Sequence, residues 1–238
     1  MSTDRFTTSL YGVGEAAGYL GVPPSTLMDW AYGYQWRRAD GEVAMAGPVI
    51  TAIRPAQRHG AALPFIGLAE AYALAAFRRA GVPLQRIRPA IDALCHELGV
   101  EHALASRRLY ADGAEILYDY ARQANGTPQS GAALELVVVR SSQQVFAEGM
   151  VAQYLRCVEF APDGYARVIR LPQYRVAEVS VDTEHAFGRP RFARSGAGLE
   201  DVVALCLAGE PAETVAAEFG LSRAEVEDAL QVATRAAA

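Results

Sequence analysis

The 238-residue sequence contains no lysine, so all 22 of its positively charged side chains are arginines. They are outnumbered by 27 acidic residues, and the formal charge at pH 7 is −5. This balance excludes a uniformly basic coat that would bind nucleic acid over the whole surface. The charge is uneven, however: residues 1–88 hold nine arginines and six acids, whereas residues 195–238 hold two arginines and eight acids. We therefore expect a mildly basic front and an acidic tail.

Cysteine is also scarce. Cys95, Cys157 and Cys206 lie far apart, are odd in number and form no C-x-x-C pair. This spacing predicts neither a disulfide framework nor a four-ligand zinc site, and it favours a reducing compartment. No stretch approaches the roughly 20 apolar residues that a bilayer requires, and the first ten residues have no signal-peptide pattern. We expect a cytoplasmic protein that does not enter a membrane.

Residues that could carry catalysis or hold a metal are sparse as well. Cys95, His96 and His102 would supply three ligands with no fourth partner nearby, so no metal site is predicted. Residues 12–14 (Gly-Val-Gly) lack the strand and the third glycine of a dinucleotide-binding loop. No serine or cysteine has the sequence context of a nucleophile, and no pair of carboxylates lies in an apolar setting. We expect neither an enzyme nor a bound cofactor.

A helix-turn-helix is predicted in residues 13–30. Gly21 ends a first short helix, and Pro24 suits the first turn of a second one. Leu27 and Trp30 are three residues apart and would form the buried stripe of that second helix. Two helices of this length are too small to close a core alone.

A β-hairpin is predicted directly after this unit. Tyr34 and Trp36 alternate in the first strand, Asp40-Gly41 is a turn signal, and the β-branched run at 49–53 would form the second strand. A hairpin in this position is called a wing. Two amphipathic helices follow, at residues 68–79 and 84–98.

The rest of the chain is predicted to be a small sheet followed by helices. A short strand at 107–110 and a short helix at 114–121 precede a linker at 125–131. Strands are expected at 134–139, 158–160, 165–171 and 176–181, with a helix at 148–156. Three helices end the chain, at 199–207, 211–219 and 222–233, the last opened by a capping box from Ser222 to Glu225. The expected class is α+β, with a winged helix-turn-helix domain (1–125), a small central β-sheet domain (132–182) and a C-terminal three-helix bundle (183–238).

The sequence contains an internal echo. The segments EAAGYLGVPPSTLMDW and TVAAEFGLSRAEVEDA share alanine, glycine and apolar positions in register, so both could be helix-turn-helix units. The second helix of the later copy carries Glu225, Glu227 and Asp228 against Arg223. Because phosphate contacts supply much of the affinity for DNA, that acidic copy should be repelled by it. We interpret the first copy as a DNA-binding element and the second as a protein-binding or dimerising element.

The front unit supplies the candidate DNA-binding residues. Its second helix would enter a major groove, and because that helix has no cation, base recognition would rest on Ser25 and Thr26. Four arginines would contact the flanking phosphates: Arg37, Arg38, Arg54 and Arg58. The alternative is that these arginines are merely solvated and the helix-turn-helix is a packing motif. Four more arginines either contact phosphate or cap helix ends: Arg78, Arg79, Arg86 and Arg88.

These segments carry a family resemblance. Residues 11–30, the arginine-bearing hairpin and residues 65–94 (FIGLAEAYALAAFRRAGVPLQRIRPAIDAL) resemble MerR-like winged-helix regulators. The motif Phe187-Gly-Arg-Pro190, followed by the three predicted helices, is similar to a small helical domain found in many bacterial antitoxins. Together they resemble a long VapB-type antitoxin of a VapBC toxin–antitoxin module.

The resemblance implies a protein that binds and neutralises a PIN-domain ribonuclease toxin and represses its own operon by binding operator DNA. A homodimer is expected, because operators of such heads are usually two-fold symmetric. Two other functions stay open. One is a one-component MerR-like regulator whose central sheet binds a small ligand, which a pocket between residues 134 and 182 would favour. The other is a structural adaptor without DNA affinity.

Overall fold

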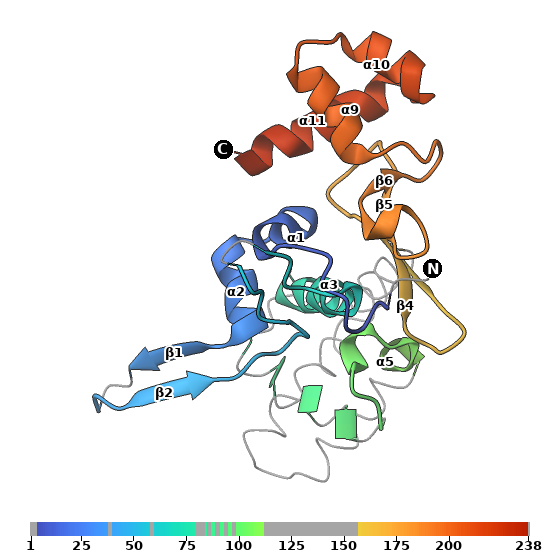
Figure 1. Cartoon of the computed structure of the whole chain (residues 1–238). Helices are drawn as coiled ribbons and strands as arrows, with labels where there is room; N and C mark the ends of the chain where they lie inside the picture. The colour runs from blue at the N-terminus through green and yellow to red at the C-terminus, as the bar shows by residue number, and fades with distance from the viewer. Residues whose placement is uncertain are drawn as a thin grey trace, which may run out of the picture.

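The computed structural model describes residues 4–37, 40–57, 60–79, 99–111 and 157–237, with positions 84, 87, 88, 91, 92, 95 and 96 between them. The chain is a mixed α+β protein, so the predicted class is confirmed. The first helices and a two-stranded hairpin occupy one end (Figure 1). The last three helices occupy the other end, and a four-stranded antiparallel sheet lies between the two.

The helix-turn-helix forms at the predicted residues. Helices α1 (Val13–Leu20) and α2 (Pro24–Tyr32) are joined through Gly21, whose φ of 62° lies in the left-handed region. Glycine adopts that conformation without the steric cost of a Cβ atom. The predicted stripe of α2 is buried, because Leu27 and Trp30 are 0% and 2% exposed.

The hairpin also forms, but its second strand is not the predicted one. Strands β1 (Tyr34–Arg37) and β2 (Val43–Ala46) pair antiparallel. The run at 49–53 was wrongly predicted to be a strand: the Val49 and Ile50 amides donate to the Trp30 carbonyl at 2.8 and 3.3 Å. This run therefore crosses the end of α2 and does not continue the hairpin.

Helix α3 (Phe65–Arg79) is the centre of the N-terminal unit and begins three residues before the predicted start. Every residue from Phe65 to Ala75 is buried, so this part of the helix is enclosed on all sides, and only its last turn reaches the surface. Gly67 is required there, since a Cβ atom would overlap the Thr51 carbonyl oxygen. The described positions between 84 and 96 are helical, as predicted.

The strand predicted at 107–110 is wrong, because these residues lie in helix α5 (Arg107–Ala111), just after the 3₁₀ turn η1 (Ala103–Ala105). The Ser106 hydroxyl accepts a hydrogen bond from the Arg108 amide at 3.2 Å, which favours a helical start over an extended chain. Pairing with the sheet is limited to an isolated bridge between Ser106 and Tyr165. The predictions at 114–121, 125–131, 134–139 and 148–156 lie outside the described residues.

The sheet has the strand order β3 (Val158–Phe160), β4 (Ala166–Arg170), β5 (Val179–Asp182) and β6 (Arg191–Phe192). The first three were predicted, although β5 begins three residues later than expected. Strand β6 was missed, because two residues carry no alternating pattern. It pairs with β5, so the sheet extends beyond residue 182.

The three C-terminal helices lie at the predicted positions: α9 (Leu199–Leu207), α10 (Ala212–Phe219) and α11 (Arg223–Ala237). The capping box is confirmed, since the Ser222 amide donates to Glu225 at 2.7 Å and the Glu225 amide donates to the Ser222 hydroxyl at 3.2 Å. Gly220 joins α10 to α11 with a φ of 65°, close to the 62° of Gly21. The internal echo is therefore repeated in the backbone.

One acid of this echo was interpreted wrongly. Asp228 was grouped with the acids that would repel DNA, yet it is only 9% exposed. Its carboxylate accepts hydrogen bonds from the amides of Arg175, Val176 and Ala177 at 2.8, 2.8 and 3.0 Å. These amides are thereby unavailable to the sheet, which explains the late start of β5. Asp228 fastens α11 to the sheet.

Candidate nucleic-acid interface

The first turn of α2 faces solvent. Ser25 is exposed and Thr26 is half-buried, while Leu27 and Trp30 anchor the opposite face in the core. Pro23 caps the helix without any side-chain hydrogen bond. The first residue of α2 is a proline without an N–H, so the amides of Ser25 and Thr26 are the ones available to an external acceptor such as a phosphate oxygen.

Two of the four predicted phosphate-binding arginines are described, and both are exposed. Arg37 ends strand β1, on the hairpin that projects from the body beside α2 (Figure 1). Arg54 lies over the ring of Tyr32, with its guanidinium carbon 6.0 Å from the ring centroid. Arg38 and Arg58 lie outside the described residues. The structure thus places one guanidinium on the hairpin and one at the end of α2.

The sequence did not identify the side chains that shape this surface. Met28, 47% exposed, and Tyr32 form one wall of a cavity of about 860 Å³ between α2, the start of α1 and the segment that carries Arg54. On the hairpin, Val43 and Met45 are 58% and 72% exposed. The surface is therefore apolar with scattered positive charges. Met28 and Tyr32 are four residues apart, which places them on one face of α2, away from its buried stripe. This spacing could have indicated an apolar exposed face.

The segment leading to Arg54 is held by a buried acid. Glu70 of α3 is 5% exposed; its carboxylate accepts hydrogen bonds from the Thr51 amide at 2.5 Å and from His102 Nδ1 at 2.8 Å. The hydrogen bond to Glu70 raises the pKa of His102 above its ordinary 6.5, although burial opposes this shift. Glu70 is the single charged residue in the apolar run 65–77, which is the pattern that could have revealed it.

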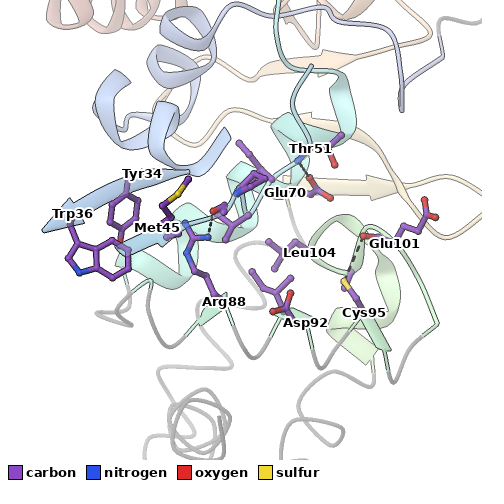
Figure 2. A pocket seen from close by; sticks show the side chains of 17 residues that line it. Tyr34, Trp36, Met45, Thr51, Glu70, Arg88, Asp92, Cys95, Glu101 and Leu104 are labelled. Carbon is purple, nitrogen blue, oxygen red and sulfur yellow. Dashed lines mark hydrogen bonds between the residues drawn. The ribbon is translucent and has the colours of Figure 1, made fainter. Parts of the chain in front are cut away.

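Two arginines near this site serve the fold. Arg79 donates from Nη2 to the Leu20 carbonyl at 2.6 Å and so caps α1, in agreement with the helix-capping alternative. Arg88 donates to the Gly47 carbonyl below the hairpin and lies 5.8 Å from the centroid of the Tyr34 ring. Figure 2 shows it in the wall of a cavity of about 640 Å³, and burial lowers its pKa. Arg86 lies outside the described residues.

The possible metal ligands have other contacts. His102 binds Glu70, and the Cys95 thiol donates to the Glu101 carbonyl at 3.7 Å. Burial raises the pKa of that thiol. Within the described ranges, no group of three or more His, Cys, Asp or Glu side chains could hold a metal ion. In the same ranges, no helix is long and apolar enough to cross a membrane.

Comparison with known proteins identifies the family. A family model described as "Putative DNA-binding HTH domain" matches residues 9–91, and one described as "Protein of unknown function (DUF433)" matches residues 179–233. Over 227 residues the chain is 45% identical to the Mycobacterium tuberculosis protein named "Putative antitoxin VapB45", with 95% of this chain and 94% of the relative covered. The chain belongs to the VapB45 antitoxin family. The resemblance to a VapB-type antitoxin is confirmed.

A second relative and a solved structure, both from Mycobacterium tuberculosis, are also similar to this VapB45-family chain. "Uncharacterized protein Rv2308" is 23% identical over 233 residues, which cover 96% of this chain and 91% of the relative. The crystal structure of Rv2018 superposes with a TM-score of 0.78 at 42% identity, covering 95% of this chain and 99% of the other. The similarity spans the helix-turn-helix end, the sheet and the C-terminal helices.

Proposed function

We propose that this VapB45-family chain is an antitoxin that represses its own operon through the helix-turn-helix end and neutralises a PIN-domain ribonuclease toxin through its C-terminal part. The observation that carries DNA binding is the open first turn of α2, with Ser25 exposed and its amides uncapped, beside two exposed arginines. A helix N-terminus, polar side chains for base edges and arginines for phosphates together match the requirements of groove recognition.

DNA binding is tested with the upstream DNA of the gene as a labelled duplex. Each of Arg37→Ala and Arg54→Ala should weaken binding and lower the slope of log K against log salt by about 0.9, the value for one lost phosphate contact. Ser25→Ala and Thr26→Ala should instead reduce discrimination against unrelated DNA. Arg235→Ala, an exposed arginine at the far end of α11, is the matched control. Wild-type binding without salt dependence would favour the adaptor instead.

Toxin binding is supported by the surface charge of the C-terminal helices. Of the eight acids after residue 194, Asp228 is buried and Glu225 is part of the capping box, but Asp201, Glu210 and Glu218 are exposed. A ribonuclease must attract RNA, so its groove is expected to be basic, and an acidic partner can occupy it.

The toxin test uses the full chain and the purified PIN-domain protein encoded beside it. A triple variant, Asp201→Asn, Glu210→Gln and Glu218→Gln, should bind this protein more slowly and more weakly, with the difference shrinking at high salt. The control is the double variant Glu42→Gln and Glu101→Gln, which removes exposed acids elsewhere. Equal association rates of the triple variant and wild type at low salt would overturn the electrostatic role. Sedimentation should show a homodimer.

One observation favours the second candidate, a one-component regulator with an effector. A cavity of about 670 Å³ lies between Gly21 and the sheet segment 170–179, and Arg79, Arg170 and Arg175 line it against one acid, Glu178. This charge suits an anionic effector. Titration with inorganic pyrophosphate tests the candidate: binding that Arg175→Ala abolishes, with a change in DNA affinity, would support it, and no binding would count against it.

A further inference from the structure

The loop between β5 and β6 contains a phenylalanine, Phe187, that is exposed to solvent and has a backbone conformation unfavourable for its side chain. Ala186, Phe187 and Gly188 have φ values of 49°, 54° and 77°, and the first two are the non-glycine residues with positive φ in the described part of the chain. The left-handed region disfavours any residue with a Cβ atom, and a bulky side chain there is an outlier. Phe187 is nonetheless 78% exposed, more than any other large hydrophobic residue in those ranges. Neither burial nor local preference explains its position.

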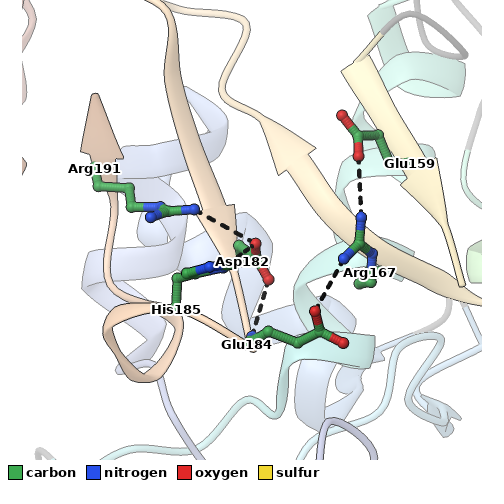
Figure 3. Close-up of polar contacts among 6 residues, drawn as sticks. All are labelled: Glu159, Arg167, Asp182, Glu184, His185 and Arg191. Atoms are coloured by element: carbon green, nitrogen blue, oxygen red, sulfur yellow. Dashed lines mark hydrogen bonds and ion pairs between the residues drawn. The ribbon is translucent and has the colours of Figure 1, made fainter. Parts of the chain in front are cut away.

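The first half of this loop is held by a buried carboxylate (Figure 3). Asp182 is 4% exposed; it accepts a hydrogen bond from the Glu184 amide at 2.9 Å and contacts His185 Nδ1 at 2.7 Å. Arg191 of β6 lies 3.6 Å from the same carboxylate. Arg167 of β4 adds an ion pair of 3.0 Å to Glu184. The loop is therefore tied to three strands of the sheet.

The second half is held by the N-terminal unit. The Gly188 carbonyl accepts a hydrogen bond from the buried Tyr11 hydroxyl at 2.9 Å. A Cβ atom on Gly188 would come within 2.6 Å of that hydroxyl oxygen, so glycine is needed for this approach. The Gly188 and Arg189 amides donate to the His185 and Ala186 carbonyls, each at 3.0 Å, which closes two successive left-handed turns. The backbone of the loop is preorganised, so binding needs to order only its side chains, which lowers the entropic cost.

We infer that Phe187 is the apolar anchor by which the C-terminal part grips its toxin, an inference that rests on the proposed function. Aromatic and arginine side chains are enriched among residues that dominate protein–protein binding energy, and Arg189 is exposed two residues further on. Strain held in a rigid loop is characteristic of functional sites.

The charges around Phe187 select the kind of partner. Arg189 lies 3.8 Å from Glu200, which places the loop beside the exposed acids of the first turn of α9, Glu200 and Asp201. Because Arg189 pairs with Glu200, the border of Phe187 carries both signs of charge. The apolar ring of Phe187 suits a protein surface rather than DNA phosphates, and the carboxylates of the first turn of α9 complement a partner with a basic surface. The toxin expected here has such a surface, in the groove that holds its RNA.

The decisive variant is Phe187→Gly, because it removes the backbone strain and the proposed toxin contact together, and these two losses have opposite measurable effects. Glycine relieves the left-handed backbone, so the melting temperature should rise, while affinity for the adjacent-gene PIN-domain protein should fall about tenfold or more. Asparagine also tolerates the left-handed conformation, so Phe187→Asn should keep its stability and likewise lose affinity for the toxin. Val176→Ala and Leu207→Ala, which shorten other exposed apolar residues (56% and 64%), should bind as wild type does.

The possible outcomes are distinguishable. If wild type does not bind the PIN-domain protein, the proposed function fails and the anchor with it. If wild type binds and the glycine variant binds equally, only the anchor is overturned. A glycine variant that loses stability would show that the ring serves the fold. A variant that changes the sedimentation of the free chain while toxin affinity stays constant would assign Phe187 to a second copy of this chain.

Discussion

At the scale of single residues, Glu70 links the buried helix α3 to the segment that carries Arg54. Its carboxylate accepts a hydrogen bond from the Thr51 amide through one oxygen and contacts His102 Nδ1 through the other. Burying this carboxylate without both partners would cost free energy of folding. The two contacts therefore fix the position of the segment that begins at Thr51. Arg54 then emerges beside Tyr32 at the end of α2.

The contribution of His102 should depend on pH. Because its folded pKa is raised above the ordinary 6.5, the stabilisation is complete below about pH 6.5 and is lost as the pH rises through the higher folded value. Relative to His102→Gln, wild type should be more stable by roughly 1 kcal/mol at pH 6, a figure reduced for partial solvent screening, and nearly equal at pH 9.

Thermal unfolding of both proteins across this range provides the measurement, with an expected melting difference of about 2–4 °C at the acid end. A difference that grows towards alkaline pH would contradict the assignment.

At the scale of elements, helical periodicity located α1, α2 and the three C-terminal helices, because each of them buries one face and exposes the other. The β-branched run at 49–53 was predicted to be a strand because such residues favour strands. They pack equally well in an irregular segment between α2 and α3, and only tertiary contacts decide which structure forms. Asp228 could not be recognised as buried, since its three partners lie about 50 residues earlier. In the candidate site, the exposure of Ser25 followed from the stripe of α2, but the stacking of Arg54 on Tyr32 has no local signal.

Asp228 should dominate the attachment of α11 to the sheet. Asp228→Ala leaves three amides without their acceptor and should lower the free energy of unfolding by about 3 kcal/mol. Asp228→Asn keeps one carbonyl oxygen and should lose less. Denaturant unfolding measures the stability, and amide hydrogen exchange at 175–177 should accelerate most in the alanine variant. The exposed Asp201→Asn is the control. Equal stability of Asp228→Ala and this control would refute the assignment.

At the scale of the whole molecule, the proposed DNA-binding and toxin-binding surfaces lie at different ends, with α2 and the hairpin directed away from the C-terminal helices (Figure 1). Tyr11 joins these ends: it precedes α1, its ring meets that of Tyr19 edge-on at 6.2 Å, and its hydroxyl binds Gly188. Tyr11 therefore lies between the two proposed binding sites.

We predict that Tyr11→Phe reduces the coupling between the two ligands. In wild type, bound toxin should change operator affinity about fivefold or more, a typical allosteric coupling. The variant should lose about 1 kcal/mol of stability and most of this change, since the hydrogen bond to the toxin-binding loop is gone. DNA titrations with and without the PIN-domain protein measure the effect. A coupling of unchanged size in the variant would place the connection elsewhere.

The matching corners at Gly21 and Gly220 mean that the same bend precedes two helices with different exposed side chains, few charges on α2 and several on α11. Both glycines have left-handed backbones, with φ of 62° and 65°, so the proposed difference in function between the two units depends on their side chains and not on the corner. The exposed residues of α2 could therefore be placed on α11, and those of α11 on α2, without a change of the corner that precedes each helix. Such an exchange within one chain would test whether side chains alone decide what each helix binds.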